Sequence, residues 1–258
     1  MTQITLKTVL FLGILKTTTA FSSEIQKNPP YSKIYLGPQV YSVKTAIRDV
    51  SHFHGTLSGA SLGYVYTKAN SLYAKAFVNW ALGSIRSSGH PSRFLHDETV
   101  EGQLGYTWAF KHMQLSPFIG YGFHYLIEHR KKSPEYASLQ FSYENYYLPL
   151  GIIWKYFFYK QCNIGLSISQ RYDVSPSVKV SDLKGVSWSL DHTTGTRLSI
   201  PIEGVIENKV QWGFCLEPFW QEYQLGKSKA ISSLGEPLGI TSQTFHEWGG
   251  ELSLNVWF

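Results

Sequence analysis

The chain has 258 residues, of which 16% are charged and 16% aromatic, and its formal net charge is +5. Soluble proteins usually carry about 25% charged residues, so this composition favours a chain that contacts apolar surroundings. The mild positive charge forms no basic stripe, which argues against nucleic acid as a main partner, and the apolar stretches are too short for spanning helices.

Residues 1–22 predict a secretory signal. Lys7 supplies the positive charge, residues 8–15 the apolar core, and the small residues around Ala20 a cleavage site. A short amphipathic helix is the alternative. Removal of this segment takes away Lys7 and Lys16 and no acid, so the net charge falls from +5 to +3. No composition break divides the remainder, so we expect one domain over residues 23–258.

Alternation with a period of two predicts about ten strands. The segment Thr99–Phe110 is the clearest, since Val100, Leu104 and Trp108 fall on one face and Glu101 and Gln103 on the other. The predicted strands are Ser32–Val43, Thr56–Thr67, Leu72–Ile85, Thr99–Phe110, Gln114–Leu126, Asn145–Lys155, Cys162–Asp173, Thr196–Ile206, Gln211–Tyr223 and Leu252–Phe258.

The predicted connections alternate between short and long. Short ones fall near Lys68–Ser71, Lys111–Met113, Phe157–Gln161 and Glu207–Val210. Long ones fall near Lys44–Gly55, Arg86–Asp97, Ile127–Leu139, Val174–Thr193 and Gln224–Phe245. Short turns at one rim and long loops at the other are typical of membrane β-barrels.

The last predicted strand ends the chain on Trp257-Phe258 and places Leu252, Leu254, Val256 and Phe258 on one face. This ending resembles the C-terminal aromatic signature of small bacterial outer-membrane β-barrel proteins. The resemblance implies an all-β, transmembrane, antiparallel up-and-down barrel in the bacterial outer membrane, with ten strands and eight as the alternative. It further implies contact with outer-membrane lipid and recognition of the last strand by the barrel-assembly machinery.

Aromatic side chains gather at the predicted periplasmic strand ends, where an interfacial girdle is expected. The girdle comprises Trp108, Phe110, Trp154, Tyr156, Trp212 and Phe258. Tyr125, Tyr143, Tyr172 and Trp220 are expected on the same outer face near the loop ends. A soluble β-sandwich or lipocalin-like barrel, with the large apolar side chains inside, is the main alternative.

The opposite face predicts a polar lumen. Its charged members are Glu101, Arg171, Asp173, Arg197, Glu203, Glu217 and Glu251, with Lys75 and Glu247 beside them. A barrel of eight to ten strands is narrow enough for side chains to fill. A paired, hydrogen-bonded plug is the favoured interpretation, and a narrow ion path the alternative.

Two adjacent pairs, Asp97-Glu98 and Asp191-His192, end predicted long loops and are the candidate catalytic residues. Omptins, which are ten-stranded outer-membrane proteases, activate water with a carboxylate pair and an Asp/His pair on such a rim. Adjacent residues on a strand point to opposite faces, so these pairs depart from the omptin spacing. The favoured interpretation is solvated loop residues.

The run Arg130-Lys131-Lys132 lies in the third predicted long loop and is a candidate contact for lipopolysaccharide phosphates. An ordinary solvated loop is the alternative. Cys162 and Cys215 have opposite predicted parity, which favours free thiols over a disulfide. We expect no metal site and no cofactor.

These observations favour a non-enzymatic surface protein with a structural, adhesive or envelope-maintenance role. A rim-active hydrolase using Asp97, Glu98, Asp191 and His192 is the second hypothesis, and a narrow pore is the third.

Overall fold

The computed structural model describes residues 31–47, 51–88, 90–132, 138–159, 162–181, 187–206, 211–228, 231–232 and 237–258. The predicted signal at residues 1–22 lies outside the described residues. Within the part of the chain that the structure describes, no helix is long and apolar enough to cross a membrane.

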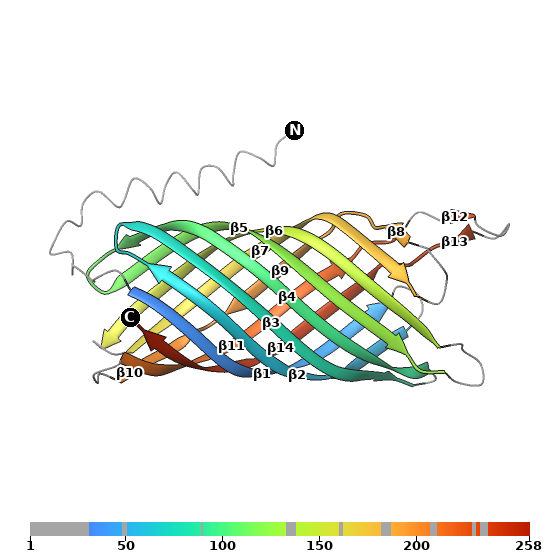
Figure 1. Ribbon diagram of the computed structural model, residues 1–258, viewed down its shortest axis with the longest axis horizontal. Coiled ribbons are helices and arrows are strands. Elements are labelled where there is room, and N and C mark those ends of the chain that lie inside the picture. Colours follow the sequence, from blue (N-terminus) through green and yellow to red (C-terminus); the bar gives the residue numbers. More distant parts are fainter. Residues whose placement is uncertain are drawn as a thin grey trace.

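The described residues form an all-β structure whose long strands wind around one axis (Figure 1). The strands are β1 (Tyr31–Ile47), β2 (Ser51–Thr67), β3 (Ser71–Ser87), β4 (His90–Ala109), β5 (Met113–Arg130), β6 (Leu139–Tyr159), β7 (Cys162–Val180), β8 (Ser187–Ser189), β9 (Thr194–Ser199), β10 (Ile202–Ile206), β11 (Gln211–Leu225), β12 (Ile231–Ser232), β13 (Pro237–Leu238) and β14 (Gln243–Trp257).

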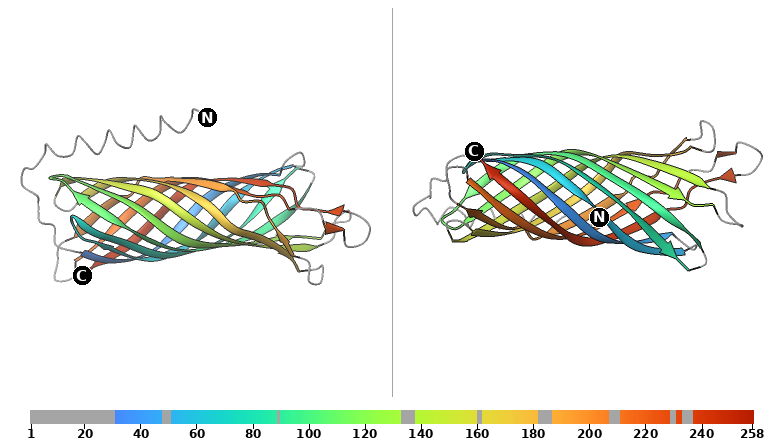
Figure 2. Two further views of the ribbon diagram at one scale, coloured as in Figure 1. Left: turned by 90° about the horizontal axis from the view of Figure 1, so that it is seen from above. Right: turned by 60° about the horizontal axis from the view of Figure 1, so that its bottom comes forward.

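Antiparallel pairing of β1 with β14 closes the sheet into a barrel, which is seen from two further sides in Figure 2. Among the described residues, the main sheet has twelve strands, and they occupy ten positions around the barrel. The reason is that β8, β9 and β10 follow one another along the same edge of β7. The prediction of a ten-stranded, antiparallel up-and-down barrel is therefore confirmed.

The described chain ends meet at one end of the barrel, where Phe258 N donates to Ser32 O at 3.0 Å (Figure 1). The connections at this end are short, as in the turn between β2 and β3. Asn70 in that turn has a positive φ of 51°, a conformation that asparagine tolerates. The longest connections lie at the opposite end, so we take the end with Phe258 as periplasmic and the other as outer.

The prediction of five long outer loops is wrong in two places. Only residues 48–50 separate β1 from β2, and only residues 88–89 separate β3 from β4. The strands themselves fill the expected loops, since they reach 21 residues in β6, whereas about 9–11 residues cross a membrane. The barrel therefore extends well beyond a bilayer.

Two aromatic belts bound an apolar band on the outer wall near the periplasmic end. The periplasmic belt includes Trp108, Tyr156, Trp212 and Phe258, all exposed. The second belt consists of exposed Trp80, Tyr121, Tyr146, Tyr172, Trp220 and Trp248. Exposed aliphatic side chains such as Leu104, Leu216 and Leu252 lie between the belts. Stretches such as Trp212–Trp220 match the length that crosses a bilayer, so this band faces lipid.

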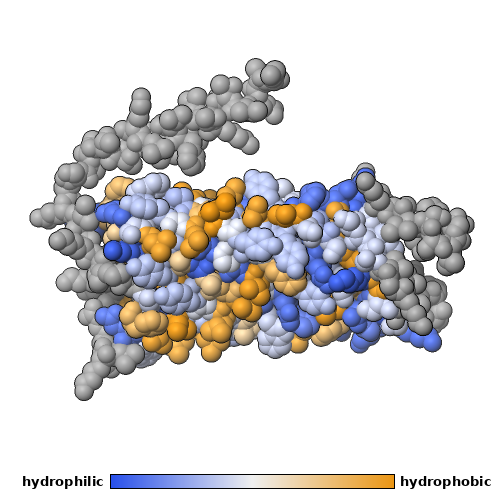
Figure 3. Space-filling model, turned by 45° about the horizontal axis from the view of Figure 1, so that its top comes forward, coloured by the Kyte–Doolittle hydropathy of each residue, from blue (hydrophilic) through white to orange (hydrophobic). Residues whose placement is uncertain are grey.

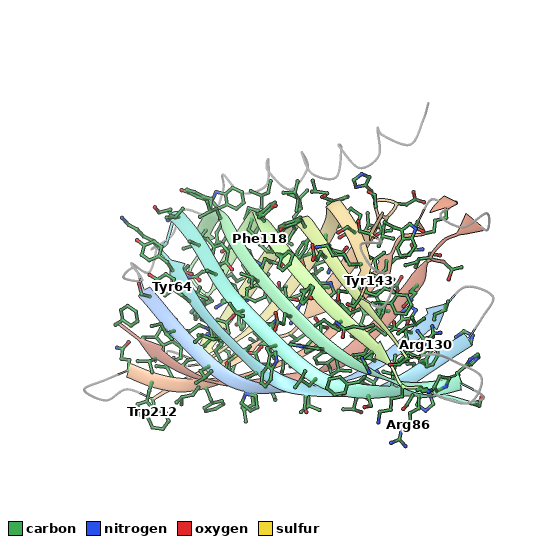
Figure 4. All side chains as sticks on the ribbon, turned by 45° about the vertical axis from the view of Figure 1, so that its right-hand side comes forward. Tyr64, Arg86, Phe118, Arg130, Tyr143 and Trp212 are labelled. Carbon is green, nitrogen blue, oxygen red and sulfur yellow. The ribbon has the colours of Figure 1, made fainter. Side chains whose placement is uncertain are left out.

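The outer wall becomes polar beyond the second belt. Its outward side chains include an ion pair of Lys179 with Glu144 and close contacts of His96 with Glu98 and of His246 with Glu222. On the face seen in Figure 3, hydrophobic colour gives way to hydrophilic colour toward the end of the barrel opposite the C-terminus that Figure 1 marks. Figure 4 places Tyr64 and Trp212 near one end of the barrel and Arg86 and Arg130 near the other. The outer half of the barrel is thus built to face water.

An apolar cluster fills the interior of this outer half, and we call it the outer plug. Its buried members are Tyr41, Val43, Ile47, Phe53, Leu57, Ala81, Ile85, Leu95, Leu126, Tyr143, Val178, Val180, Trp188, Leu190, Phe219, Tyr223, Leu225 and Phe245. The prediction that Tyr143 faces outward is therefore wrong. The side chain is buried and its hydroxyl accepts a hydrogen bond from Gln243 Nε2 at 3.2 Å.

Candidate functional site: the polar lumen and the outer rim

A charge cluster around Glu203 occupies the periplasmic third of the lumen. Lys33 Nζ donates to Glu203 Oε1 at 2.6 Å, and Lys155 Nζ donates to Oε2 at 3.1 Å. Asn163 Nδ2 also donates to Oε2, at 3.0 Å. One carboxylate thus holds two ammonium groups from β1 and β6, which ties three distant parts of the barrel wall together. Breaking such a buried group by removing one partner costs about 3–5 kcal/mol.

A second group lies at mid-height. Glu217 and Glu251 are directly opposite each other on β11 and β14. Arg197 Nη2 lies 3.6 Å from Glu217 Oε1, and Lys75 Nζ lies over the Tyr35 ring at 5.7 Å. Lys75 lines the same cavity as both carboxylates. Like charges placed opposite each other destabilise a sheet, and the nearby cations offset this repulsion.

A third group, centred on Arg171, lies just below the outer plug. Arg171 Nε donates to Asp173 Oδ1 at 3.0 Å, and its Nη2 lies 3.3 Å from His124 Nδ1. Because a guanidinium only donates, Nδ1 accepts and His124 Nε2 carries the proton that it donates to Asp97 Oδ1 at 2.9 Å. The Tyr41 hydroxyl donates to Asp97 Oδ2 at 3.0 Å. These contacts join Arg171, Asp173, His124, Asp97 and Tyr41 into one network.

Glu101 completes the lumen groups predicted from the sequence. The Tyr147 hydroxyl donates to Glu101 Oε2 at 2.6 Å, and Gln103 Nε2 donates to the other oxygen. Tyr73 in turn donates to Gln103 Oε1 at 3.0 Å. All seven charged residues expected in the lumen thus face the interior of the barrel, where Glu251 lies opposite Glu217 and the other six contact polar or charged side chains.

Small cavities lie among these groups, and two of them are lined by described residues. One of about 70 Å³ is lined by residues that include Lys33, Lys75, Glu203 and Glu217. The other, of about 50 Å³, is lined by residues that include Glu101 and Arg171. Each has room for a few water molecules with polar partners. Both lie on the periplasmic side of the outer plug.

The four candidate catalytic residues are not gathered at the rim. Asp97 and Glu98 lie within β4, not in a loop, and face opposite sides of the wall. Asp97 is 8% exposed and bound to His124 inside, whereas the Glu98 side chain is 44% exposed and pairs with His96 outside. Asp191 is exposed at the outer end, and His192 Nδ1 lies 3.0 Å from the backbone oxygen of Asp173.

The Asp97–His124 pair resembles the orienting half of a catalytic triad, but its surroundings are those of a structural group. His124 is 2% exposed, and the Tyr223 ring lies against it edge-on at 5.2 Å. A general base must come within hydrogen-bonding reach of a substrate proton, and the outer plug covers this pair. The sequence does not predict this pair, because the predicted strand begins only at Thr99 and leaves Asp97 in a loop. The odd positions from Arg93 to Gln103 carry the inward alternation through Asp97 and were the available signal.

The basic run lies at the outer end of β5. Arg130 is the last residue of that strand, and its guanidinium lies 5.7 Å from the centre of the Phe141 ring. Lys131 and Lys132 follow it and are exposed. The stretch from Tyr121 in the second belt to Arg130 rises roughly 20 Å at the usual strand rise and tilt. These charges therefore lie well above the level of the lipid band.

Of the predicted girdle, Trp154 and Phe110 are partly buried, while Trp108, Tyr156, Trp212 and Phe258 are exposed. Cys162 and Cys215 are free, as the opposite parity of their positions predicts. In the described ranges, no three or more His, Cys, Asp or Glu side chains gather in a way that would hold a metal ion.

Comparison with known proteins gives a likeness in fold. The outer membrane protease OmpT from Escherichia coli is 10% identical over 92% of this chain and 99% of that chain, with a TM-score of 0.54. The translocator domain of the autotransporter NalP from Neisseria meningitidis is 10% identical over 97% of each chain, with a TM-score of 0.50.

No family model matches the chain, and no curated protein matches it by sequence. The fold is that of bacterial outer-membrane β-barrels, and the lipid-facing band between two aromatic belts assigns the chain to that membrane.

Proposed function

We propose that this protein is a non-conducting surface protein of the outer membrane, which acts through contacts made by its outer rim. The observation that carries this proposal is the outer plug. Large buried side chains, among them Phe53, Tyr143, Tyr223 and Phe245, fill the lumen where a pore would open to the outside. Ion conduction requires a wetted path, and a packed apolar interior has none.

The polar lumen below the plug has a structural role in this proposal. Its charges are paired and hydrogen-bonded, as in the cluster of Lys33, Lys155 and Glu203. Paired charges of this kind hold a small barrel in one shape. The scattered positions of Asp97, Glu98, Asp191 and His192 leave the hydrolase hypothesis without an assembled site.

The outer rim carries basic side chains that could bind anionic groups on another surface. Arg130, Lys131, Lys132 and Lys227 lie at the outer end, and three of them are exposed. Guanidinium and ammonium groups at this height suit phosphorylated or sulfated glycans on a facing surface.

We also keep the proposal that the strand Leu252–Phe258 is recognised by the barrel-assembly machinery.

Planar-bilayer recording with the refolded full chain tests the proposal. The wild-type protein should give no conductance steps, and steps that change in Arg171→Gln or Arg197→Gln would overturn the proposal in favour of a pore. Loss of peptide or lipid cleavage in His192→Ala, after cleavage by the wild type, would overturn it in favour of a hydrolase.

A second experiment tests the contact role directly. Cells that display the chain on their surface are offered two kinds of bead, one coated with heparin and one made of uncharged dextran. Attachment to the heparin beads should exceed attachment to dextran and should fall in Arg130→Gln/Lys131→Gln/Lys132→Gln. Equal attachment of the wild type and this variant would contradict a contact role for the rim.

A further inference from the structure

A row of basic side chains crosses four neighbouring strands on the outer wall. In the register of the sheet, His246 on β14 pairs with Lys44 on β1, Lys44 pairs with His54 on β2, and His54 pairs with Arg86 on β3. All four point outward, because the residues on either side of each along its strand face the interior. We call this set the basic row.

The basic row differs from the other charges of the outer wall in that three of its four members have no acidic partner among the described residues. Elsewhere, Lys179 is paired with Glu144 at 2.7 Å and His96 with Glu98 at 2.8 Å. Within the row, His246 at one end has Glu222 at 3.1 Å. Among the described residues, no acidic side chain lies within salt-bridge distance of Lys44, His54 or Arg86. The row thus places an ammonium and a guanidinium, with an imidazole between them, along one line of the wall, and such hydrogen-bond donors favour a bound anionic group.

Below the basic row, toward the membrane, the outward side chains of the paired strands change from basic to hydroxyl-bearing. One step toward the membrane, Trp248 pairs with Ser42, Ser42 with Thr56, and Thr56 with Ser84. Further down, Val40, Leu62 and Trp80 are exposed and belong to the lipid-facing band. The wall therefore runs from apolar to hydroxyl to basic as it leaves the bilayer.

The row also climbs away from the membrane. His246 is the next outward residue beyond Trp248 of the second belt, whereas Leu82 and Ser84 separate Arg86 from Trp80 of the same belt. Neighbouring strands are about 4.8 Å apart, so the four side chains follow an oblique line of roughly 15 Å. The line begins at headgroup level and rises beyond it.

We propose that this wall binds a phosphorylated glycolipid of the outer leaflet, with acyl chains on the band, sugar hydroxyls at Ser42, Thr56 and Ser84, and phosphates at Lys44, His54 and Arg86. The order of the three surfaces matches the order of groups along such a lipid. Juxtamembrane basic residues attract anionic headgroups, and arginine binds phosphate through two nitrogens. The inference requires the barrel to lie in the outer membrane and does not depend on the rim function proposed above.

The test is a titration of the refolded full chain in detergent micelles with lipopolysaccharide that carries both lipid A phosphates, read by native mass spectrometry. Lys44→Gln/His54→Gln/Arg86→Gln should raise the apparent Kd roughly 10- to 30-fold, as expected for two lost basic charges near a lipid surface. Lys44→Arg/Arg86→Lys should bind within about threefold of the wild type, since the charges stay.

The matched control is Lys68→Gln/Lys111→Gln, which removes the same number of fixed positive charges from exposed positions at the periplasmic end and should leave the Kd within about threefold. Unheated gel mobility checks that each variant is folded. If the row variant keeps the wild-type affinity, or if the control variant loses as much affinity as the row variant, the proposal is overturned.

Two further measurements need no variant. Wild-type protein should bind lipopolysaccharide stripped of its lipid A phosphates about as weakly as the row variant binds the intact lipid. Equal binding of both lipids would overturn the proposal. Displacement of the lipid by low-millimolar inorganic phosphate would also overturn it, because the site would then be one for free phosphate.

Discussion

The periplasmic and outer halves of this barrel are built in opposite senses. In the periplasmic half, Leu104 and Leu252 face out and Glu203 and Glu217 face in. In the outer half, Phe53 and Phe245 face in, while His54 and Arg86 face out. The surroundings explain the inversion, because lipid excludes polar side chains from the outer surface and water favours burial of apolar ones. The same strands therefore continue from a membrane barrel into a water-exposed one.

The largest effect should come from the polar half of the interior. Glu203→Ala leaves Lys33 and Lys155 buried without their carboxylate and should lower the free energy of unfolding by about 3–5 kcal/mol. Urea unfolding of the refolded protein in micelles, followed by tryptophan fluorescence, measures this loss. The control is Glu98→Ala, whose partner His96 is on the outer wall, with an expected loss of about 1 kcal/mol or less. Equal losses would mean that the lumen cluster contributes no more than a surface pair.

A comparable loss is expected from the apolar half of the interior. The Phe245 ring stacks on Tyr223 at 4.8 Å and 3° between planes. Phe245→Ala should therefore cost about 3–5 kcal/mol through lost burial and the cavity that remains. Phe94→Ala, on the water-facing wall of β4, should cost less than about 1 kcal/mol. If the two variants unfold at the same urea concentration, the outer plug is not a packed core.

A smaller effect separates the two outer surfaces. Leu104→Arg puts a charge in the lipid-facing band and should cost about 2–4 kcal/mol if Leu104 lies near the bilayer centre. Gln224→Arg, on the outward face of β11 beyond Trp220, should change stability by less than about 0.5 kcal/mol. The two variants should be refolded into lipid vesicles rather than micelles, so that the stability of each is measured in a bilayer. A similar cost at both positions would indicate that the bilayer covers both.

The sequence was sufficient to predict the barrel, its strand number and the lipid-facing half of each strand. In that half, apolar-out and polar-in alternation is regular, as from Val100 to Trp108, and the aromatic ends mark the interface. It was not sufficient for the outer half. There the phase inverts, so Phe53 and Leu57 occupy the positions that a lipid-facing rule assigns to polar residues. A prediction that expects apolar residues on the outer face along the whole strand therefore assigns the inverted stretch to a loop.

That inversion also explains the errors at the candidate site. Asp97 falls in a predicted loop because the predicted strand begins only at Thr99. Tyr143 is predicted on the outer face because it is a large aromatic residue near a loop. Local irregularity adds to the difficulty. Val174 is an extra residue in β7, since Tyr146 pairs with Ser175 and Tyr147 with Asp173. Beyond this bulge the inward positions of β7 change from odd to even.

The inversion itself is tested most directly by placing single cysteines along the outer wall, with Cys162 and Cys215 replaced by serine. A fluorophore at Leu104, Leu216 or Leu252 should be quenched by spin-labelled lipid acyl chains and protected from a water-soluble quencher. A fluorophore at Thr56, Ser84 or Gln224 should show the reverse. Strong acyl-chain quenching at both sets of positions would contradict a barrel whose outer half lies in water.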